Sequence, residues 1–219
     1  MKDIPLHKGK AYIQELVAQG EHQQQDFKLT ISDPRKIARS ISAFANTEGG
    51  HLLIGVKDNG MVAGVRNEED VYVVEQAAEM YCAPPQAVDF TAYTTGADRG
   101  GIVIKATVGR ASERPVCVRE EKGALRAYWR VADENIAAHP IMVRGWRLQA
   151  SPAGTRLSAS GPDAALLRAL AHSGTVSVEQ ALRLTSASER SATGALARMF
   201  ALGLIEFAHR GNGFVITLT

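Results

Sequence analysis

The run Thr47-Glu48-Gly49-Gly50 could hold a nucleotide phosphate, because glycine lets a backbone approach an anion closely. A phosphate loop needs a strand, the loop and then a helix start, so that free N–H groups and the positive end of the helix dipole face the anion. Here a helical pattern precedes the glycines and the apolar run 51–56 follows them, which is the reverse order. The chain also lacks Gly-x-x-x-x-Gly-Lys-Ser/Thr. We therefore predict a corner, with Gly49 left-handed at the helix end and Gly50 allowing close packing.

Basic side chains on the helix before this corner could neutralise nucleic-acid phosphates. Arg35, Lys36 and Arg39 fall on the side opposite the apolar residues of that helix, and Lys28 precedes it. An ordinary solvated helix face gives the same pattern, because phosphate contacts require clustering in space. Both interpretations stay open at the level of sequence.

Metal and covalent chemistry have little support in the residue types. The six histidines are scattered without zinc spacing, and Cys82 and Cys117 lie far apart. Two such cysteines indicate small buried side chains in a reducing cytoplasm. No Ser-His-Asp or Cys-His arrangement can be argued, and we expect no bound cofactor.

Helical and strand patterns alternate over the first two thirds of the chain. A helical stripe begins at Leu6 and ends at Gly20, Asp33 is placed to N-cap a helix that starts at Pro34, and a third helix is expected from Glu68 to Tyr81. Helices with an at least partly antiparallel sheet define an α+β domain. The expected strands are 27–31, 51–56, its hairpin return 61–65, and then 88–95, 101–108, 115–118 and 125–131.

Composition separates the end of the chain from the rest. The 219 residues are 45% hydrophobic and 22% charged, which is typical of a soluble globular protein, and a net charge of +2 identifies no partner. Residues 151–219 contain six arginines, no lysine and four acids. The Ser/Ala/Gly/Pro-rich stretch 149–162 predicts a linker between domains at 1–148 and 163–219. No apolar run approaches the length of a membrane span, so secretion and membrane insertion are not expected.

The tail predicts three helices followed by strand, turn and strand, the order of a winged helix-turn-helix. Capping boxes at 177–180 and 186–189 are expected to open its second and third helices. In the third helix, an outward stripe of Arg190, Thr193 and Ala197 could face DNA. Ser188 and Thr193 could bond phosphates, and Arg210 lies in the expected wing. Protein docking is the alternative use of such a domain.

Three segments carry a family resemblance: Asp26-Phe27-Lys28, the run ISAFANTEGGHLLIGVKDNGMVAGV at 41–65, and RAYWRVADEN at 126–135. Together they resemble the Schlafen AlbA-type DNA-binding domain of bacterial regulators, over roughly residues 10–140. The resemblance implies an α+β domain associated with nucleic acid and often joined to a winged helix. This chain departs from the family at Asp26, where the motif usually has glutamate.

The same resemblance implies a candidate metal site. Eukaryotic Schlafen relatives include nucleases that cut structured RNA with three carboxylates, which correspond by motif to Glu21, Asp26 and Asp58. Three converging carboxylates could hold Mg²⁺ or Mn²⁺ and polarise a phosphodiester. Alternatively, Glu21 is a solvated loop acid and Asp58 a turn residue that bonds its own backbone. The shorter Asp26 side chain and Lys57, where an acid is frequent, weaken the catalytic interpretation.

The leading hypothesis is therefore a cytoplasmic, bacterial-type DNA-binding transcriptional regulator. A homodimer is expected because helix-turn-helix proteins generally read two half-sites. A divalent-metal-dependent ribonuclease that uses Glu21, Asp26 and Asp58 is the second hypothesis. ATP binding that modulates DNA binding is the third and weakest.

Overall fold

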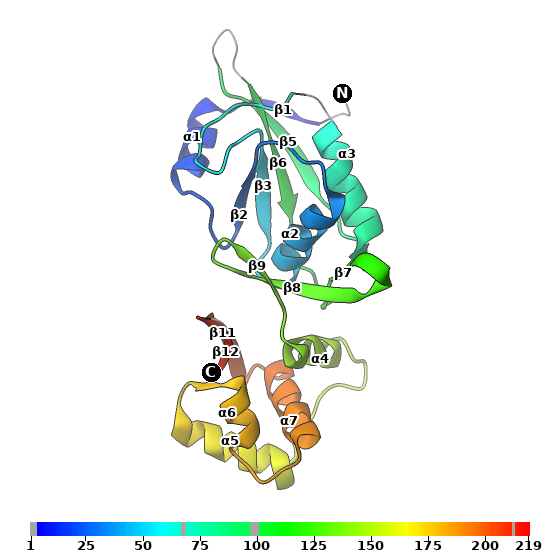
Figure 1. Ribbon diagram of the computed structural model, residues 1–219, viewed down its shortest axis with the longest axis vertical. Coiled ribbons are helices and arrows are strands. Elements are labelled where there is room, and N and C mark those ends of the chain that lie inside the picture. Colours follow the sequence, from blue (N-terminus) through cyan, green and yellow to red (C-terminus); the bar gives the residue numbers. More distant parts are fainter. Residues whose placement is uncertain (1–3, 67–68, 97–100, 212) are drawn as a thin grey trace. The chain divides into compact units, whose positions relative to one another are not determined.

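A computed structural model describes residues 4–66, 69–96, 101–211 and 213–219, and the chain divides into two compact units (Figure 1). The first comprises residues up to Ser112 together with Val116–Ala137, and the second comprises Glu113–Pro115 and Ala138–Thr219. The division thus falls before helix α4 (Pro140–Gln149), whereas the first domain was predicted to extend to residue 148. The segment 149–162, which was expected to be a linker between domains, lies within the second unit.

The first unit is built on a mixed sheet. β1 (Leu6–Lys8) pairs in parallel with β5 (Asp89–Thr94), and β2 (Gln25–Lys28) pairs in parallel with β3 (Gly50–Ile54). The central pairs are antiparallel, and β1 and β2 form the two edges. The mixed sheet and its helices confirm the predicted α+β class. In the described part of the chain the order across this sheet is β1 (Leu6–Lys8), β5 (Asp89–Thr94), β6 (Ile102–Val108), β3 (Gly50–Ile54) and β2 (Gln25–Lys28).

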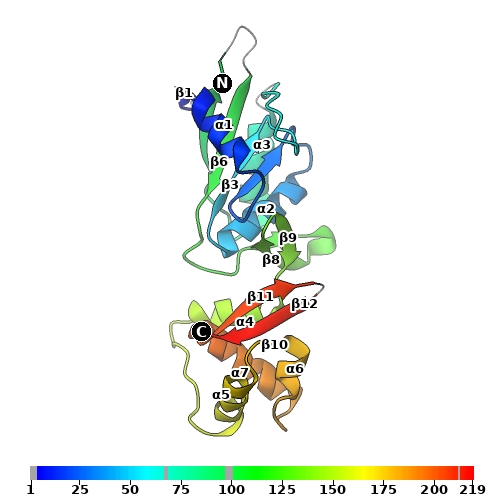
Figure 2. The same cartoon turned by 90° about the vertical axis from the view of Figure 1, so that its left-hand side faces the viewer.

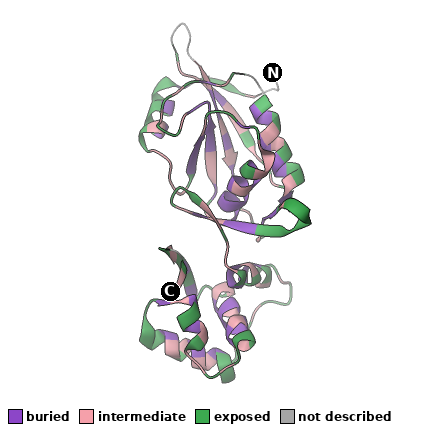
Figure 3. Ribbon diagram, viewed as in Figure 1, coloured by how far each residue is buried: buried purple, intermediate pink, exposed green. Residues whose placement is uncertain are grey.

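Helix α2 (Pro34–Asn46) covers one face of this sheet and is buried along most of its length (Figure 3). Its N-cap is as predicted: the Asp33 carboxylate accepts hydrogen bonds from the backbone N–H groups of Arg35 and Lys36, at 2.9 and 3.2 Å. Ile37, Ile41 and Phe44 belong to the main hydrophobic core. Helix α3 (Glu69–Gln76) continues as a π-helical turn, Ala77–Tyr81, over the range expected for the third helix, except that Glu68 lies outside the described residues.

The opposite face of the sheet is covered by α1 (Lys10–Ala18) (Figure 2). Ile13 and Leu16 pack there against Phe27, Leu53 and Val103. Gly20 follows the helix with φ +71°, as predicted. The expected helical stripe is shorter than predicted, because residues 6–8 pair with β5 and form β1 instead.

The hairpin expected after β3 does not form as a pair of strands. Residues 61–65 contribute only an isolated bridge, between Val56 and Val62. Gly64 donates to the Gly55 carbonyl at 2.9 Å, and Val65 donates to the Ile102 carbonyl at 2.8 Å. The segment therefore turns back on residues 55–57, just beyond β3, before Val65 reaches β6.

A second, antiparallel sheet packs against α2. Of its strands, β4 and β9 were not predicted from the sequence. The residues that the structure describes place it in the order β4 (Cys82–Ala83), β7 (Cys117–Arg119), β8 (Leu125–Val131) and β9 (Glu134–Ala137).

The second unit combines helices with a small antiparallel sheet. The Ser177–Gln180 capping box is confirmed in both directions. The next helix is capped by Ser188, whose Oγ accepts from the Ser191 N–H at 3.3 Å, and not by the expected box at 186–189. After α4 come α5 (Gly161–Ser173), β10 (Val176–Ser177), α6 (Val178–Arg183), α7 (Glu189–Ala201), β11 (Ile205–Arg210) and β12 (Gly213–Leu218), with sheet order β10-β12-β11.

No helix in the described ranges is both long and apolar enough to span a membrane.

Candidate functional site

The glycine corner between α2 and β3 has the predicted geometry. Gly49 has φ +77°, and a Cβ atom there would lie 2.9 Å from the Val108 carbonyl oxygen. A Cβ on Gly50 would lie 2.4 Å from Phe44 Cδ1. The N–H groups of Thr47 and Gly49 both donate to the Phe44 carbonyl, at 3.0 and 2.9 Å. These amides close the helix end and do not point toward an external anion.

Polar residues near the end of α2 hold the second sheet in place. Asn46 accepts from the Val116 N–H at 2.8 Å and donates to the carbonyls of Val116 and Tyr128, at 2.8 and 2.9 Å. The Ser42 hydroxyl accepts from the Tyr128 N–H at 3.1 Å. Buried backbone groups must be hydrogen-bonded, and these two side chains of α2 pair with the backbone groups of Val116 and Tyr128.

Arg130, in β8, is the centre of a buried polar network. Its side chain is 1% exposed, and its Nη1 donates to Asn135 Oδ1 at 2.9 Å. Asn135 Nδ2 donates to Ser40 Oγ at 2.9 Å, and Ser40 Oγ donates to Asp26 Oδ2 at 3.4 Å. Arg130 Nη2 lies 3.9 Å from Asp26 Oδ1, which closes the ring. We call Asp26, Ser40, Arg130 and Asn135 the Arg130 network.

The network anchors the edge strand β2 through main-chain contacts as well. Arg130 Nη2 donates to the Gln25 carbonyl at 3.0 Å, and its guanidinium lies over the Phe44 ring, 5.1 Å from the centroid. Burial lowers the pKa of Arg130, while the nearby carboxylates of Asp26 and Glu21 oppose this shift. A buried guanidinium of this kind is tolerated because its terminal nitrogens are paired and hydrogen-bonded, although Nε has no hydrogen-bond partner among the described residues.

Lys28 and Glu21 lie beside Asp26. Lys28 Nζ donates to Asp26 Oδ1 at 2.9 Å and to the Phe27 carbonyl at 2.6 Å. Glu21 Oε1 accepts from the Phe27 N–H at 2.8 Å, so Glu21 is part of the strand edge and not a solvated loop acid. Burial, followed by a hydrogen bond with Asp26, raises the pKa of Glu21.

The third acid of the expected metal site is not part of this group. Asp58 is exposed in the turn after β3, where Asn59 and not Asp58 accepts a backbone hydrogen bond, from Met61 N–H at 3.0 Å. The residues described in the structure include no group of three or more His, Cys, Asp or Glu side chains placed to hold a metal ion. The structure therefore brings together Glu21 and Asp26 without a third ligand.

Two of the three basic residues on α2 are engaged within the protein. Arg39 donates to both carboxylate oxygens of Glu120, at 2.9 and 2.7 Å, and lies over the Tyr128 ring. The hydrogen bond with Arg39 is the main reason that the pKa of Glu120 is lowered. Arg35 stacks over the Tyr81 ring, 5.4 Å from its centroid. Lys36 is the most exposed of the three, while Arg35 and Arg39 are partly exposed and already contact other side chains of the protein.

In the second unit, α4 covers part of the expected reading face of α7. Ala197, expected to point outward, is fully buried. A Cβ on Gly145 of α4 would lie 3.1 Å from the Ala197 carbonyl oxygen and 2.5 Å from Phe200 Cδ1, so the two helices cross closely. The other predicted contacts remain accessible: Ser188, Arg190 and Arg210 are exposed, and Thr193 is half-buried.

Arg144 on α4 is a basic residue that the sequence analysis did not select. A Cβ on Gly194 of α7 would lie 3.7 Å from both terminal nitrogens of Arg144 and 3.3 Å from Arg198 Nη1. Arg198 is held by Asp163, to which its Nε donates at 3.1 Å, whereas Arg144 is exposed. The helical pattern of residues 140–149 could have indicated a helix that packs in the second unit, but residues up to 148 were predicted to belong to the first domain.

The first unit is thus an α+β domain in which a buried arginine–carboxylate network secures an edge strand beside a glycine corner. The chain belongs to the Schlafen AlbA_2 family, since the family model "Schlafen, AlbA_2" matches residues 21–139, more than half of the chain. All four members of the Arg130 network lie within the match.

Among solved structures, the chain is similar to the DIP2311 protein from Corynebacterium diphtheriae, with 19% sequence identity and a TM-score of 0.45. The similarity covers 88% of this chain and 34% of that one, so this chain spans about a third of the length of that protein.

Proposed function

We propose that this chain is a DNA-binding transcriptional regulator that acts as a homodimer. Its second unit has the element order of a winged helix-turn-helix, α5-β10-α6-α7 followed by the β11–β12 hairpin. The observation that carries the proposal is the open first part of α7, where Ser188, Arg190 and Thr193 remain accessible. A family commonly linked to nucleic-acid binding supports the same function.

The basic residues of the second unit supply the contacts in this proposal. Arg190 can reach a base edge or a phosphate, and Arg210, at the end of β11, can contact the backbone beside the recognition helix. Arg144 borders α7 at Gly194 and adds a further phosphate contact. The buried Ala197 takes no part.

The Arg130 network has a structural role in the proposal. Arg130 is too deeply buried to reach a phosphate, and Arg39 is paired with Glu120. We do not extend the proposal to RNA cleavage, because Glu21 and Asp26 have no third acid at a metal-binding position within the described residues. Structured RNA incubated with Mg²⁺ or Mn²⁺ is expected to stay intact.

The proposal is tested by fluorescence anisotropy with duplex DNA at increasing salt. We expect the logarithm of the affinity to fall linearly with the logarithm of salt concentration, because bound phosphates release counterions. Arg190→Ala should bind more weakly, while Arg156→Ala, which removes the same charge from an exposed loop, should bind like the wild type. Absence of binding at every salt concentration would refute the proposal, and light scattering that gives a monomer mass would refute the homodimer.

A further inference from the structure

The two faces of the main sheet are covered unequally. The α2 face also packs against α3 and strands of the second sheet, whereas the other face is covered by the nine-residue helix α1. Beside α1, this second face carries Tyr93 on β5 and Lys105 on β6, both half-exposed. Tyr93 packs partly against the core cluster of this face, and both side chains remain partly accessible beside α1.

Two tyrosines and a lysine contact one another there, and two further lysines lie where β1 ends and α1 begins. Lys105 Nζ donates to Tyr12 Oη at 2.7 Å and lies 5.4 Å from the centroid of the Tyr12 ring. The Tyr12 and Tyr93 rings have centroids 5.1 Å apart, and Tyr12 is 36% exposed. We call Lys8, Lys10, Tyr12, Tyr93 and Lys105 the lysine–tyrosine surface.

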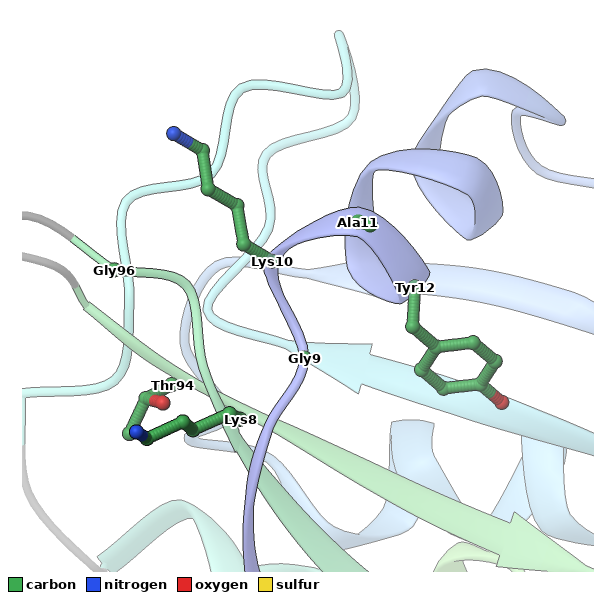
Figure 4. A pocket seen from close by; sticks show the side chains of 7 residues that line it. All are labelled: Lys8, Gly9, Lys10, Ala11, Tyr12, Thr94 and Gly96. Atoms are coloured by element: carbon green, nitrogen blue, oxygen red, sulfur yellow. The ribbon is translucent and has the colours of Figure 1, made fainter.

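An open pocket of about 560 Å³ lies at one end of this surface, within the range of about 300–1,000 Å³ typical of ligand sites. Lys8, Lys10, Tyr12 and Thr94 help to line it. Figure 4 shows Lys8 and Lys10 diverging on the side of Gly96, with the Tyr12 ring on the other side of the first turn of α1. Gly9 makes this shape possible, since a Cβ there would lie 2.4 Å from Tyr93 Cδ1.

We propose that the lysine–tyrosine surface binds single-stranded nucleic acid, with phosphates at Lys8 and Lys10 and a base stacked on Tyr12. This proposal extends the proposed nucleic-acid-binding function to a second site. Positively charged grooves combined with aromatic rings are how proteins bind single strands, because unpaired bases expose faces that can stack. A duplex hides those faces, so it would use the lysines without the ring.

The local charge favours an anionic partner. Three lysines belong to the surface, and the nearest acids along its elements are Glu15 on α1 and Asp89 at the start of β5. The positive field of Lys105 reaches His51 on β3, where it adds to burial in lowering the pKa to about 4. His51 is therefore neutral at pH 7, and the lysines account for the positive charge of this face.

The test compares a labelled single strand of about 16 nucleotides with the matching duplex, by anisotropy on the full chain. Tyr12→Leu should bind the single strand about 5- to 100-fold more weakly, whereas Tyr12→Phe, which keeps the ring, should bind like the wild type. Lys8→Ala/Lys10→Ala should weaken binding and lower the salt slope by about 1.4, or 0.7 for each lost phosphate contact. The charge-matched control is Lys122→Ala/Arg126→Ala, two exposed basic residues outside the surface, which should leave the slope unchanged.

The outcomes separate this proposal from the general function. Duplex binding that depends on Arg190, together with single-strand binding that ignores Tyr12, Lys8 and Lys10, would overturn only the second site. Equal losses of single-strand affinity in Tyr12→Leu and Tyr12→Phe would rule out stacking and overturn the second site. Stronger binding of the duplex through these same residues would overturn the second site as well. Failure to bind either nucleic acid would refute both proposals. Thermal unfolding of each variant checks that the changes in affinity do not come from misfolding.

Discussion

The arginines of the two units differ in their surroundings. In the first unit, Arg39 donates to both oxygens of Glu120, and Arg130 is buried in a ring of hydrogen bonds. In the second unit, Arg190 and Arg210 are exposed. The segment with the strongest family resemblance therefore uses Arg130 to hold the domain together, although Arg126 on the same strand is exposed. The tail keeps Arg190 and Arg210 accessible, while its Arg198 is paired with Asp163. A recognisable motif does not by itself mark the ligand-binding surface.

The largest effect that would test this comparison is expected at Arg130. Arg130→Ala removes the hydrogen bonds to the Gln25 carbonyl and to Asn135 Oδ1, and each hydrogen bond from a charged group contributes about 1.5–3 kcal/mol to the unfolding free energy, while Asp26 keeps its ion pair with Lys28. Urea unfolding measures the loss. Arg126→Ala, on the same strand but exposed, should change stability by less than about 0.5 kcal/mol. Equal effects of the two substitutions would contradict a structural role specific to Arg130.

The glycine corner should show the next largest effect. Gly50→Ala places a methyl group 2.4 Å from Phe44 Cδ1 and 2.9 Å from the Gln24 carbonyl oxygen, and overpacking of this kind costs about 1–3 kcal/mol. Gly109→Ala is the control, because no other group lies within 4 Å of its added Cβ. Denaturant unfolding of both variants compares them. A neutral Gly50→Ala would show that the corner is not closely packed.

The second unit should respond in affinity rather than in stability. Arg190→Ala removes an exposed side chain, so its melting temperature should match that of the wild type, while duplex binding weakens by about 1–3 kcal/mol. Anisotropy and thermal unfolding on the same preparation measure both quantities. An unchanged affinity would remove α7 from the proposed interface.

The smallest effect concerns the ion pair of Arg39 with Glu120. The pKa of Glu120 lies below its ordinary value of 4.5, chiefly because Arg39 donates to the carboxylate. The stabilisation is therefore present above pH 4.5 and is lost as pH falls through the lowered value. Because Arg39 is partly exposed, we expect a contribution of less than about 1 kcal/mol. Unfolding at pH 7 and pH 3 should show a smaller pH dependence in Glu120→Gln than in the wild type, and identical profiles would contradict the pairing.

Local signals in the sequence predicted much of the fold. Asp33 and Pro34 marked the start of α2, Gly20 marked the end of α1, and Gly49 took the expected left-handed conformation. These features depend on interactions a few residues apart. The return segment at 61–65 pairs with residues 55–57, as the local hairpin signal predicted, but it forms no continuous strand, and its last residue, Val65, bonds to the distant Ile102.

The candidate site was harder to predict because its contacts join distant segments. Ser40, Arg130 and Asn135 were not singled out, although all three lie within or beside the recognised motifs. Their meeting depends on β8 and β9 packing across α2. Likewise, the burial of Ala197 depends on α4, which lies about 50 residues earlier in the chain.

The sequence by itself determined the α+β class, the family, the caps of several helices and the glycine corner. Each of these follows from local periodicity, short-range hydrogen bonding or a contiguous motif. Only the tertiary structure decided which charged side chains face inward. Arg39 and Arg130 meet carboxylates contributed by other elements, whereas Arg190 is exposed. The physical reason is that a long basic side chain suits either water or a buried acid, and the position of that acid is set by packing between segments far apart in the chain.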